Sequence, residues 1–356
     1  MRTDHDVSLD VTKGILIILV ILGHVSTFLI FERGIKPPSI PSPLAVSDYL
    51  WVFLRQSLGF VIPVFLFISG YVLTQVYKLK TPLSIFRFYK NRLKRIYVPF
   101  LFWLSVYMLF FWDEITLSQV LISLVFLDGS CHFWYIWVIC ILYLFFPFLL
   151  AAARKNAALV VLGMVSLVLL SFAFKDKPFT NSYTINFILQ DKILVLPENG
   201  LYFLMGMLTA LRLDKNIFQV PFSTPSLILL ISLAVVVSLG KGVRYLDQSF
   251  IGDPRCYYAV TFFYAMICLY LFLRFVNALV MKDHCMTKPL ALMGQSSYGI
   301  YLSHMAVIYL LRNASGLFWP ASSTLYALTT LIACTGIAYL LMKIQLKSRV
   351  RLVTGF

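Results

Sequence analysis

The chain of 356 residues is 60% hydrophobic and 16% aromatic, and only 13% of its residues are charged. These values exclude an ordinary soluble globular protein, in which roughly a quarter of the residues are charged. Repeated apolar stretches of about 17 to 25 residues predict an all-α, polytopic bundle of membrane helices. We expect a single membrane domain over residues 1–356. The net charge of +15 does not indicate nucleic-acid binding, because the basic residues gather in short loops between apolar stretches.

The first predicted span, residues 9–31, contains Lys13 and His24, which are eleven residues apart. Because this spacing is close to three helical turns, both side chains lie on one face of the helix. At about 1.5 Å of rise per residue, the imidazole lies roughly 16 Å further along the axis, well inside a bilayer. An ionisable side chain is costly at that depth, so His24 is a candidate functional residue. Asp10, three residues before Lys13, is expected to pair with it.

The second span, residues 54–77, contains Ser69 and Gly70, interpreted as a close-packing joint because no base lies near them in the sequence. Lysines and arginines crowd the following segment, as in a cytoplasmic loop. With that loop inside, about ten spans alternate across the membrane and both termini are cytoplasmic. The remaining spans are 96–112, 133–152, 157–174, 197–213, 224–240, 257–280, 289–312 and 321–343. The apolar run 115–127 is too short to cross and is interpreted as a re-entrant or interfacial helix; if it crosses, every later span inverts.

Arg92 and Arg95 stand three residues apart at the start of the third span, beside aromatic residues that suit a membrane interface. Two guanidinium groups on one helix face can form a forked site for phosphate. Ordinary cytoplasmic anchors that bind lipid headgroups would have the same composition. This segment alone leaves both interpretations open.

Six short motifs follow one another along the chain. They are Asp10-x-x-Lys13-x10-His24, Val64-Phe-Leu-Phe-Ile-Ser69-Gly70-Tyr71, Arg92-x-x-Arg95 before Pro99, His132-Phe-Trp134-Tyr-Ile-Trp137, Tyr202-Phe-Leu-Met-Gly206 and Ser297-Tyr-Gly-Ile-Tyr-Leu-Ser-His304. In order and spacing they resemble the acyltransferase 3 family of integral-membrane O-acyltransferases, over about residues 5–345. The chain is most similar to the short, single-domain members, including the intercellular adhesin proteins that modify poly-N-acetylglucosamine.

The resemblance implies transfer of an acyl group, usually acetyl, from cytoplasmic acyl-CoA to a hydroxyl of a cell-surface polysaccharide or another envelope glycan. The similarity to the short members leaves succinyl open as the acyl group. His24 would be the catalytic histidine, and Arg92, Arg95 and Lys13 would bind the acyl-CoA donor, with no metal involved. Expected partners are the glycan acceptor, membrane lipids and a glycan synthase, for a multi-pass protein of the cell membrane.

A chemical role for His24 also follows without the resemblance. A hydroxyl is a poor nucleophile until a base takes its proton, and a neutral imidazole suits that task near pH 7. The donor's phosphates would be held at the inner face by Arg92 and Arg95 while the thioester arm reaches up between the helices. His24 is therefore the predicted general base.

Four further residues are candidates for binding the acceptor. His132 and Trp134 stand at the predicted outer edge of a span, where they either anchor the helix in the interface or stack on a sugar. Glu198, at the mouth of the sixth span, is either an acceptor contact or a helix-start residue. His304 lies about as deep as His24 and is either a second site residue or a packing histidine.

Other classes of membrane protein place ionisable residues in similar positions. Proton-coupled transporters and glycan exporters carry them along a transport path. Transporters often show paired halves with interrupted helices, whereas this sequence shows no convincing repeat, and the Arg92 and Arg95 pair suits a phosphate-rich ligand better than a path. A non-catalytic subunit of a synthase complex is a third alternative, and it predicts no binding of acyl-CoA.

Overall fold

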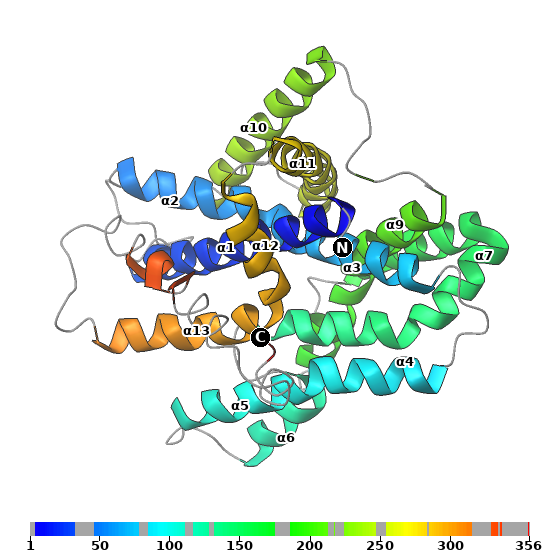
Figure 1. Cartoon of the computed structure of the whole chain (residues 1–356), viewed down its shortest axis with the longest axis horizontal. Helices are drawn as coiled ribbons and strands as arrows, with labels where there is room; N and C mark the ends of the chain where they lie inside the picture. Colours follow the sequence, from blue (N-terminus) through cyan, green and yellow to red (C-terminus); the bar gives the residue numbers. More distant parts are fainter. Residues whose placement is uncertain are drawn as a thin grey trace. The chain divides into compact units, whose positions relative to one another are not determined.

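The computed structural model describes residues 4–32, 46–77, 85–110, 117–127, 132–174, 186–212, 217, 224–246, 254–282, 285–314, 329–333, 335–336 and 355. Within these residues every regular element is a helix and no strand is present, which confirms the predicted all-α fold (Figure 1). In the described part of the chain, six helical segments are long and apolar enough to cross a membrane, and shorter apolar helices accompany them. Contacts divide the chain into two compact units: residues 1–64, 215–345 and 356 form the first, and residues 65–214 and 346–355 form the second.

The first unit is assembled around its N-terminal helix. Its elements are α1 (Asp4–Glu32), α2 (Val46–Ser57), the 3-10 turn η1 (Leu58–Phe60), α10 (Thr224–Leu246), α11 (Pro254–Met281), α12 (Thr287–Gln295) and α13 (Ser297–Ala314). The dark blue helix α1 packs along the orange helix α12 and also contacts α2, α11 and α13 (Figure 1). α10 lies against α2 and α11.

Glycines set the distance between α1 and α12. A Cβ on Gly14 would overlap the carbonyl oxygen of Leu290, and a Cβ on Gly294 would overlap the carbonyl oxygen of Asp10. Membrane helices approach most closely where small residues let their backbones touch. The position of α12 on α1 is therefore fixed by main-chain atoms.

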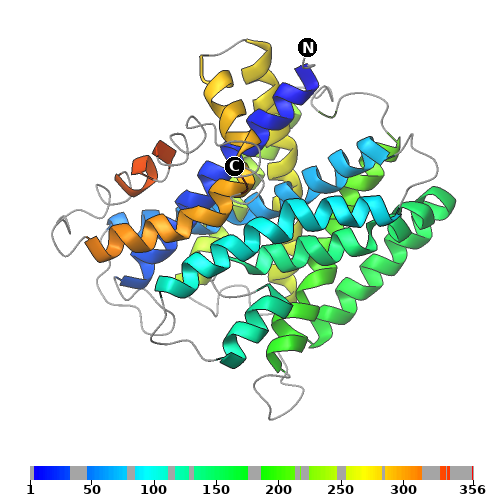
Figure 2. The ribbon, with the colours of Figure 1, turned by 60° about the horizontal axis from the view of Figure 1, so that its bottom comes forward.

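The second unit contains a similar close crossing. Its elements are most of α3 (Val61–Tyr77), α4 (Ile85–Arg92), the π-helical segment η2 (Leu93–Tyr97), α5 (Val98–Phe110), α6 (Leu117–Phe126), α7 (Trp134–Phe174), the π-helical segment η4 (Phe187–Ile193) and α9 (Val195–Arg212). The green helices α7 and α9 pack side by side (Figure 2). A Cβ on Gly70 of α3 would overlap the carbonyl oxygen of Phe203, and a Cβ on Gly206 of α9 would overlap that of Phe67. The close-packing joint predicted at Ser69 and Gly70 is confirmed by this contact.

The helix α7 covers two predicted spans, 133–152 and 157–174, in one element of 41 residues. Its length along the chain, about 60 Å, is twice the thickness of the hydrocarbon core. The backbone leaves helical geometry at Asn156, where φ is −151° and ψ is 92°. The side-chain oxygen of Asn156 accepts a hydrogen bond from the Leu159 N–H at 3.1 Å, as an N-cap does. Asn156 therefore separates two helices at the predicted junction.

The structure changes or refines three other predicted segments. Residues 289–312 do not form one helix, because Ser296, with φ −104° and ψ 11°, separates α12 from α13. The run 115–127 forms α6, whose ten residues reach about 15 Å, half of the hydrocarbon thickness, as a re-entrant or interfacial helix would. Of the span 321–343, only the helical residues 329–333 and 335–336 are described, and the rest lies outside the described residues.

Candidate active site

His24 of α1 lies beside His304 of α13 in the first unit. The centroids of the two rings are 5.1 Å apart, and the ring planes are tilted by 49°. About one turn further along, Phe28 and Tyr309 meet edge to face with centroids 5.9 Å apart, so the two helices stay in contact along this line. The His304 side chain is buried, whereas His24 is partly exposed. The structure thus brings together the two histidines that the sequence places at similar depth.

His304 is oriented by its own helix. Its Nδ1 lies 2.7 Å from the carbonyl oxygen of Tyr301. Because a carbonyl oxygen can only accept a hydrogen bond, Nδ1 carries the proton and donates it. In the neutral imidazole the free lone pair is then on Nε2, which is the ring atom able to take up a proton.

Arg55 of α2 reaches α1 one turn beyond His24. Its Nε donates a hydrogen bond to Oγ1 of Thr27 at 2.6 Å, and the Thr27 hydroxyl donates in turn to the carbonyl oxygen of Gly23 at 2.7 Å. The guanidinium group interacts electrostatically with the imidazole of His24. The motifs in the sequence do not single out Arg55, although an arginine at the edge of the apolar run 54–77 is a visible signal.

Lys241 of α10 is a second cation that no sequence motif singles out. The residue is only 3% exposed, and its Nζ lies 4.7 Å from the centre of the Tyr264 ring. The Tyr264 hydroxyl donates to the carbonyl oxygen of Ser57 at 2.7 Å, and the Ser57 hydroxyl contacts that of Ser238. These contacts join α2, α10 and α11 around the ammonium group.

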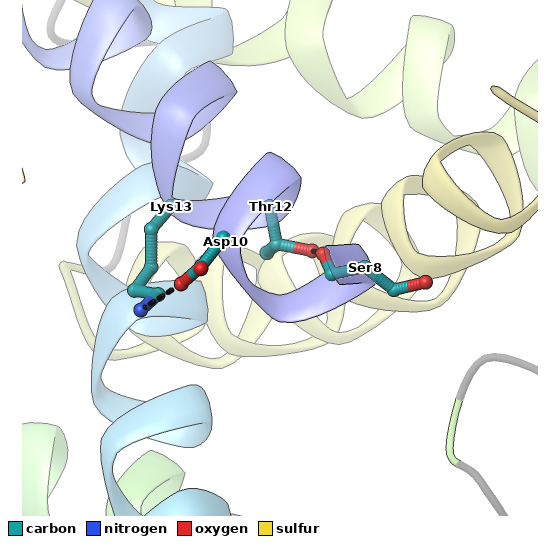
Figure 3. A network of polar contacts seen from close by, with 4 residues as sticks. All are labelled: Ser8, Asp10, Thr12 and Lys13. Carbon is teal, nitrogen blue, oxygen red and sulfur yellow. Dashed lines mark hydrogen bonds and ion pairs between the residues drawn. The ribbon is translucent and has the colours of Figure 1, made fainter. Parts of the chain in front are cut away.

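The predicted pairing of Asp10 with Lys13 is confirmed. Nζ of Lys13 lies 2.7 Å from Oδ1 of Asp10, and the two side chains are 31% and 12% exposed respectively (Figure 3). The pair lies beside the Gly14 contact with α12. In the same turn, Thr12 Oγ1 donates to the carbonyl oxygen of Ser8 at 2.7 Å (Figure 3). The ion pair therefore marks the point where α1 and α12 cross.

A cavity of about 670 Å³ opens in the second unit beside the arginine motif. Its wall is mostly apolar and aromatic, while Lys90 and Arg92 contribute positive charge. Tyr89, which also lines the cavity, donates a hydrogen bond to the carbonyl oxygen of Leu144 at 2.7 Å. Partial desolvation raises the pKa of the Tyr89 phenol, which keeps the donor protonated. The cavity therefore combines an apolar wall with cationic groups.

Arg92 is held between aromatic rings at this cavity. Its Cζ lies 5.2 Å from the centroid of Tyr143 and 5.6 Å from that of Phe88. Its Nε is buried and has no hydrogen-bond partner within the described residues. A guanidinium group carries five donors in a planar fork that matches carboxylate and phosphate. Both rings contact the guanidinium group, and one of its donors has no acceptor among the described residues.

Ser69 of α3 is connected to this arrangement through two tyrosines. Its hydroxyl lies close to the Tyr135 and Tyr143 hydroxyls. The Tyr135 ring also packs against Phe65, with centroids 6.4 Å apart. Because Tyr143 stacks on Arg92, Ser69 supports one of the rings that hold the guanidinium group.

Arg95 lies in a different environment from Arg92. Its side chain is exposed and does not line the cavity. The cause is the π-helical segment η2, in which hydrogen bonds run from residue i to i+5. Since such a turn contains more residues than an α-helical turn, side chains three residues apart no longer share one face. The forked site expected from the spacing in an α-helix is not formed by these two side chains.

The remaining predicted acceptor contacts lie in the second unit. His132 is 1% exposed and packs against Phe133 and Tyr107, with ring centroids 4.3 and 5.5 Å away, so its ring is not open to a sugar. Trp134 is half-buried at the start of α7. Glu198 lies in the first turn of α9, where a carboxylate suits the positive end of the helix dipole. These placements favour anchoring and helix-start roles.

Nearly the whole chain matches a known protein family. Residues 6–343 match the model of a family described as "Acyltransferase domain". Searches of the curated proteins and of the solved structures gave no significant match. The matched region includes every motif from Asp10 to His304. The chain therefore belongs to the acyltransferase 3 family of membrane acyltransferases.

Proposed function

We propose that the protein transfers an acyl group from cytoplasmic acyl-CoA to a hydroxyl of a cell-envelope glycan, with His24 as general base. Acetyl is the acyl group usual in the family, and succinyl is the alternative. The observation that carries this proposal is the contact of His24 with His304 inside a membrane acyltransferase domain. The partly exposed imidazole of His24 suits a general base, and the buried imidazole of His304 beside it suits a residue that supports this base.

In the proposed reaction, His24 takes the proton of the acceptor hydroxyl while the hydroxyl oxygen attacks the thioester carbonyl carbon. A C–O ester bond forms, the C–S bond breaks, and the proton passes from His24 to the departing thiolate of CoA. His304, whose Nδ1 proton is committed to Tyr301, faces this chemistry with Nε2 as its basic atom. It can therefore orient the His24 ring or share its proton.

The donor is proposed to bind at the cavity beside Arg92. Charge-assisted hydrogen bonds from Arg92, with Lys90 on the same cavity wall, suit the phosphates of CoA. The apolar wall suits the pantetheine arm and the acyl group. The buried, unused donor of Arg92 supports this assignment. Lys13, on the helix of His24, stays a candidate contact of the same donor.

The acceptor is proposed to be a neutral or acidic polysaccharide outside the cytoplasmic membrane, modified together with a glycan synthase. Mass analysis of surface polysaccharide from cells with and without the chain would identify acceptor and modification together. A mass increase of an acetyl or succinyl group only in cells with the chain is the expected result.

The direct test uses purified protein in nanodiscs, fed acetyl-CoA or succinyl-CoA and a short N-acetylglucosamine oligomer. Free CoA thiol and acylated sugar are both measured. We expect His24→Ala to lower transfer by about a hundredfold or more, because general-base catalysis typically contributes that much. Helical content and the elution volume of the variant should match the wild type.

Two results would contradict the proposal. Transfer by His24→Ala at the wild-type rate would exclude the base mechanism. Proton-driven flux of a glycan into proteoliposomes, without any release of CoA, would instead support the transporter alternative.

A further inference from the structure

Lys241 is buried in a way that ordinary membrane lysines avoid. A lysine near the end of a span usually extends its ammonium group to water or lipid headgroups. Lys241 instead is 3% exposed, with Nζ over the Tyr264 ring and close to Gly59, where a Cβ would lie 2.8 Å from Nζ. The missing side chain of Gly59 thus makes room for the ammonium group inside the first unit.

Arg55 lies on α2, one turn before Gly59 of the adjoining turn η1. Arg55 is tied through its Nε to Thr27, which follows His24 by three residues on α1. Its guanidinium group interacts electrostatically with both His24 and Lys241. Arg55 and Lys241 therefore belong to one cluster of helices in the first unit, and Arg55 links this cluster to the helix of His24.

Among the described residues, the ammonium group of Lys241 has no acidic partner. No carboxylate lies within 4 Å of the Lys241 Nζ in the described part of the chain. The carboxylate of Asp10 is instead paired with Lys13. A cation–π contact offsets only part of the cost of removing an ammonium group from water. A site of this kind is stabilised when an anion binds.

We propose that Lys241 and Arg55 bind a carboxylate carried by the substrate that reacts at His24. This inference rests on the proposed function and deepens it, because it names a chemical class of substrate. The carboxylate belongs either to a dicarboxylic acyl group, such as succinyl, or to an acidic sugar of the acceptor. Arg55 supplies a planar fork and Lys241 a point charge, which together suit a carboxylate held beside the base.

The test compares wild type with Lys241→Gln in nanodiscs, using two donors and two acceptors. The donors are acetyl-CoA and succinyl-CoA, and the acceptors are a neutral N-acetylglucosamine oligomer and an oligosaccharide that contains a uronic acid. The control is Lys282→Gln, which removes an exposed lysine just after α11. The measured quantity is the ratio of kcat/KM between the carboxylate-bearing and the neutral substrate.

We expect one of the two ratios to fall about tenfold or more in Lys241→Gln, as loss of a charge-assisted hydrogen bond would cause, and to be unchanged in Lys282→Gln. A fall in the ratio of succinyl-CoA to acetyl-CoA assigns the carboxylate to the acyl group. A fall in the ratio of acidic to neutral acceptor assigns it to the glycan.

Equal ratios in wild type and Lys241→Gln would overturn the proposal, whether or not overall turnover falls. If the wild type transfers nothing with any pair, the proposed function fails separately. In that event, thermal stabilisation by succinyl-CoA and by the acidic oligosaccharide is compared with stabilisation by their neutral counterparts. Stabilisation that is specific to the carboxylate and lost in Lys241→Gln supports the site, and its absence overturns it.

Discussion

Arg92 keeps a guanidinium group among apolar side chains by stacking it between the rings of Phe88 and Tyr143. The ammonium group of Lys13 is stabilised in a different way, by a 2.7 Å ion pair with Asp10. In an ion pair the two charges neutralise each other. A stacked guanidinium group keeps N–H donors at its edge that can bind another molecule. Arg92 therefore keeps donors for a ligand, whereas Lys13 would have to share its ammonium group between Asp10 and the proposed donor.

The two arginines of the motif should differ in their effect on donor binding. Arg92→Lys removes the planar fork and its aromatic stacking, so we expect the KM for acyl-CoA to rise about tenfold. Arg95→Lys, at an exposed position, is the matched control and should change KM less than threefold. Steady-state kinetics with varied acyl-CoA measures both, and equal effects would show that the cavity does not bind the donor.

Among single residues, the sequence predicts those whose spacing carries the information. Asp10 and Lys13 pair as their separation of three residues requires, and His24 follows on the same uninterrupted helix. Arg55 and Lys241 escape prediction because their partners lie on other helices, far away in the chain. Their environment becomes visible only when those helices are packed.

Helices in the second unit are positioned by backbone contact as well as by side chains. Gly70 and Gly206 face carbonyl groups of the opposite helix, and each lacks the atom that would hold the two apart. Apolar side chains give little net attraction between helices in lipid, so close packing of this kind carries much of the association energy. The crossing of α3 and α9 also supports Ser69, which precedes Gly70.

Enlarging this crossing should destabilise the protein. Gly206→Val places side-chain atoms against the Phe67 carbonyl, and overpacking of this kind costs about 1–3 kcal/mol or more. Gly163→Val, in α7, is the matched control because a Cβ there meets nothing within 4 Å. Thermal unfolding of the detergent-solubilised protein should show a lower Tm for Gly206→Val alone. An equal loss in both variants would mean that helix propensity, not the crossing, sets the effect.

Hydropathy predicts where helices occur better than how they bend. The junction between residues 152 and 157 is predicted correctly, because Arg154, Lys155 and Asn156 interrupt an apolar run. The π-helical turn at Leu93–Tyr97 and the break at Ser296 are not predicted, although Pro99 closely follows the first and the polar run 294–297 surrounds the second. The π-helical turn places the Arg92 and Arg95 side chains in different environments.

Orientation in the membrane belongs to the whole molecule. The lysines and arginines of the segment before the third span predict that this segment is cytoplasmic, and the expected alternation of spans then predicts the side of the other loops. In this layout the segment between α11 and α12 is also cytoplasmic. It includes Cys285, whose thiol is exposed and not in a disulfide.

Labelling of a single cysteine tests this layout. A variant that keeps only Cys285 should react with a membrane-impermeant maleimide in inside-out vesicles and not in intact cells. A variant that keeps only Cys256, predicted on the opposite side, should show the reverse pattern. Labelling of Cys285 from outside would mean that residues 115–127 cross the membrane and that every later span is inverted.

The reciprocal contact of Gly14 and Gly294 has a consequence for how this enzyme can evolve. α13 continues from α12 after a single residue. The position of the His304 ring beside His24 therefore depends on the backbone contact at Gly14 and Gly294, about three turns away. We expect a methyl group at either glycine to move the His304 ring relative to His24, and so to lower the proposed acyl transfer, without touching either ring. We expect neither glycine to change alone, and homologues that change one of them should carry a relocated second histidine or none.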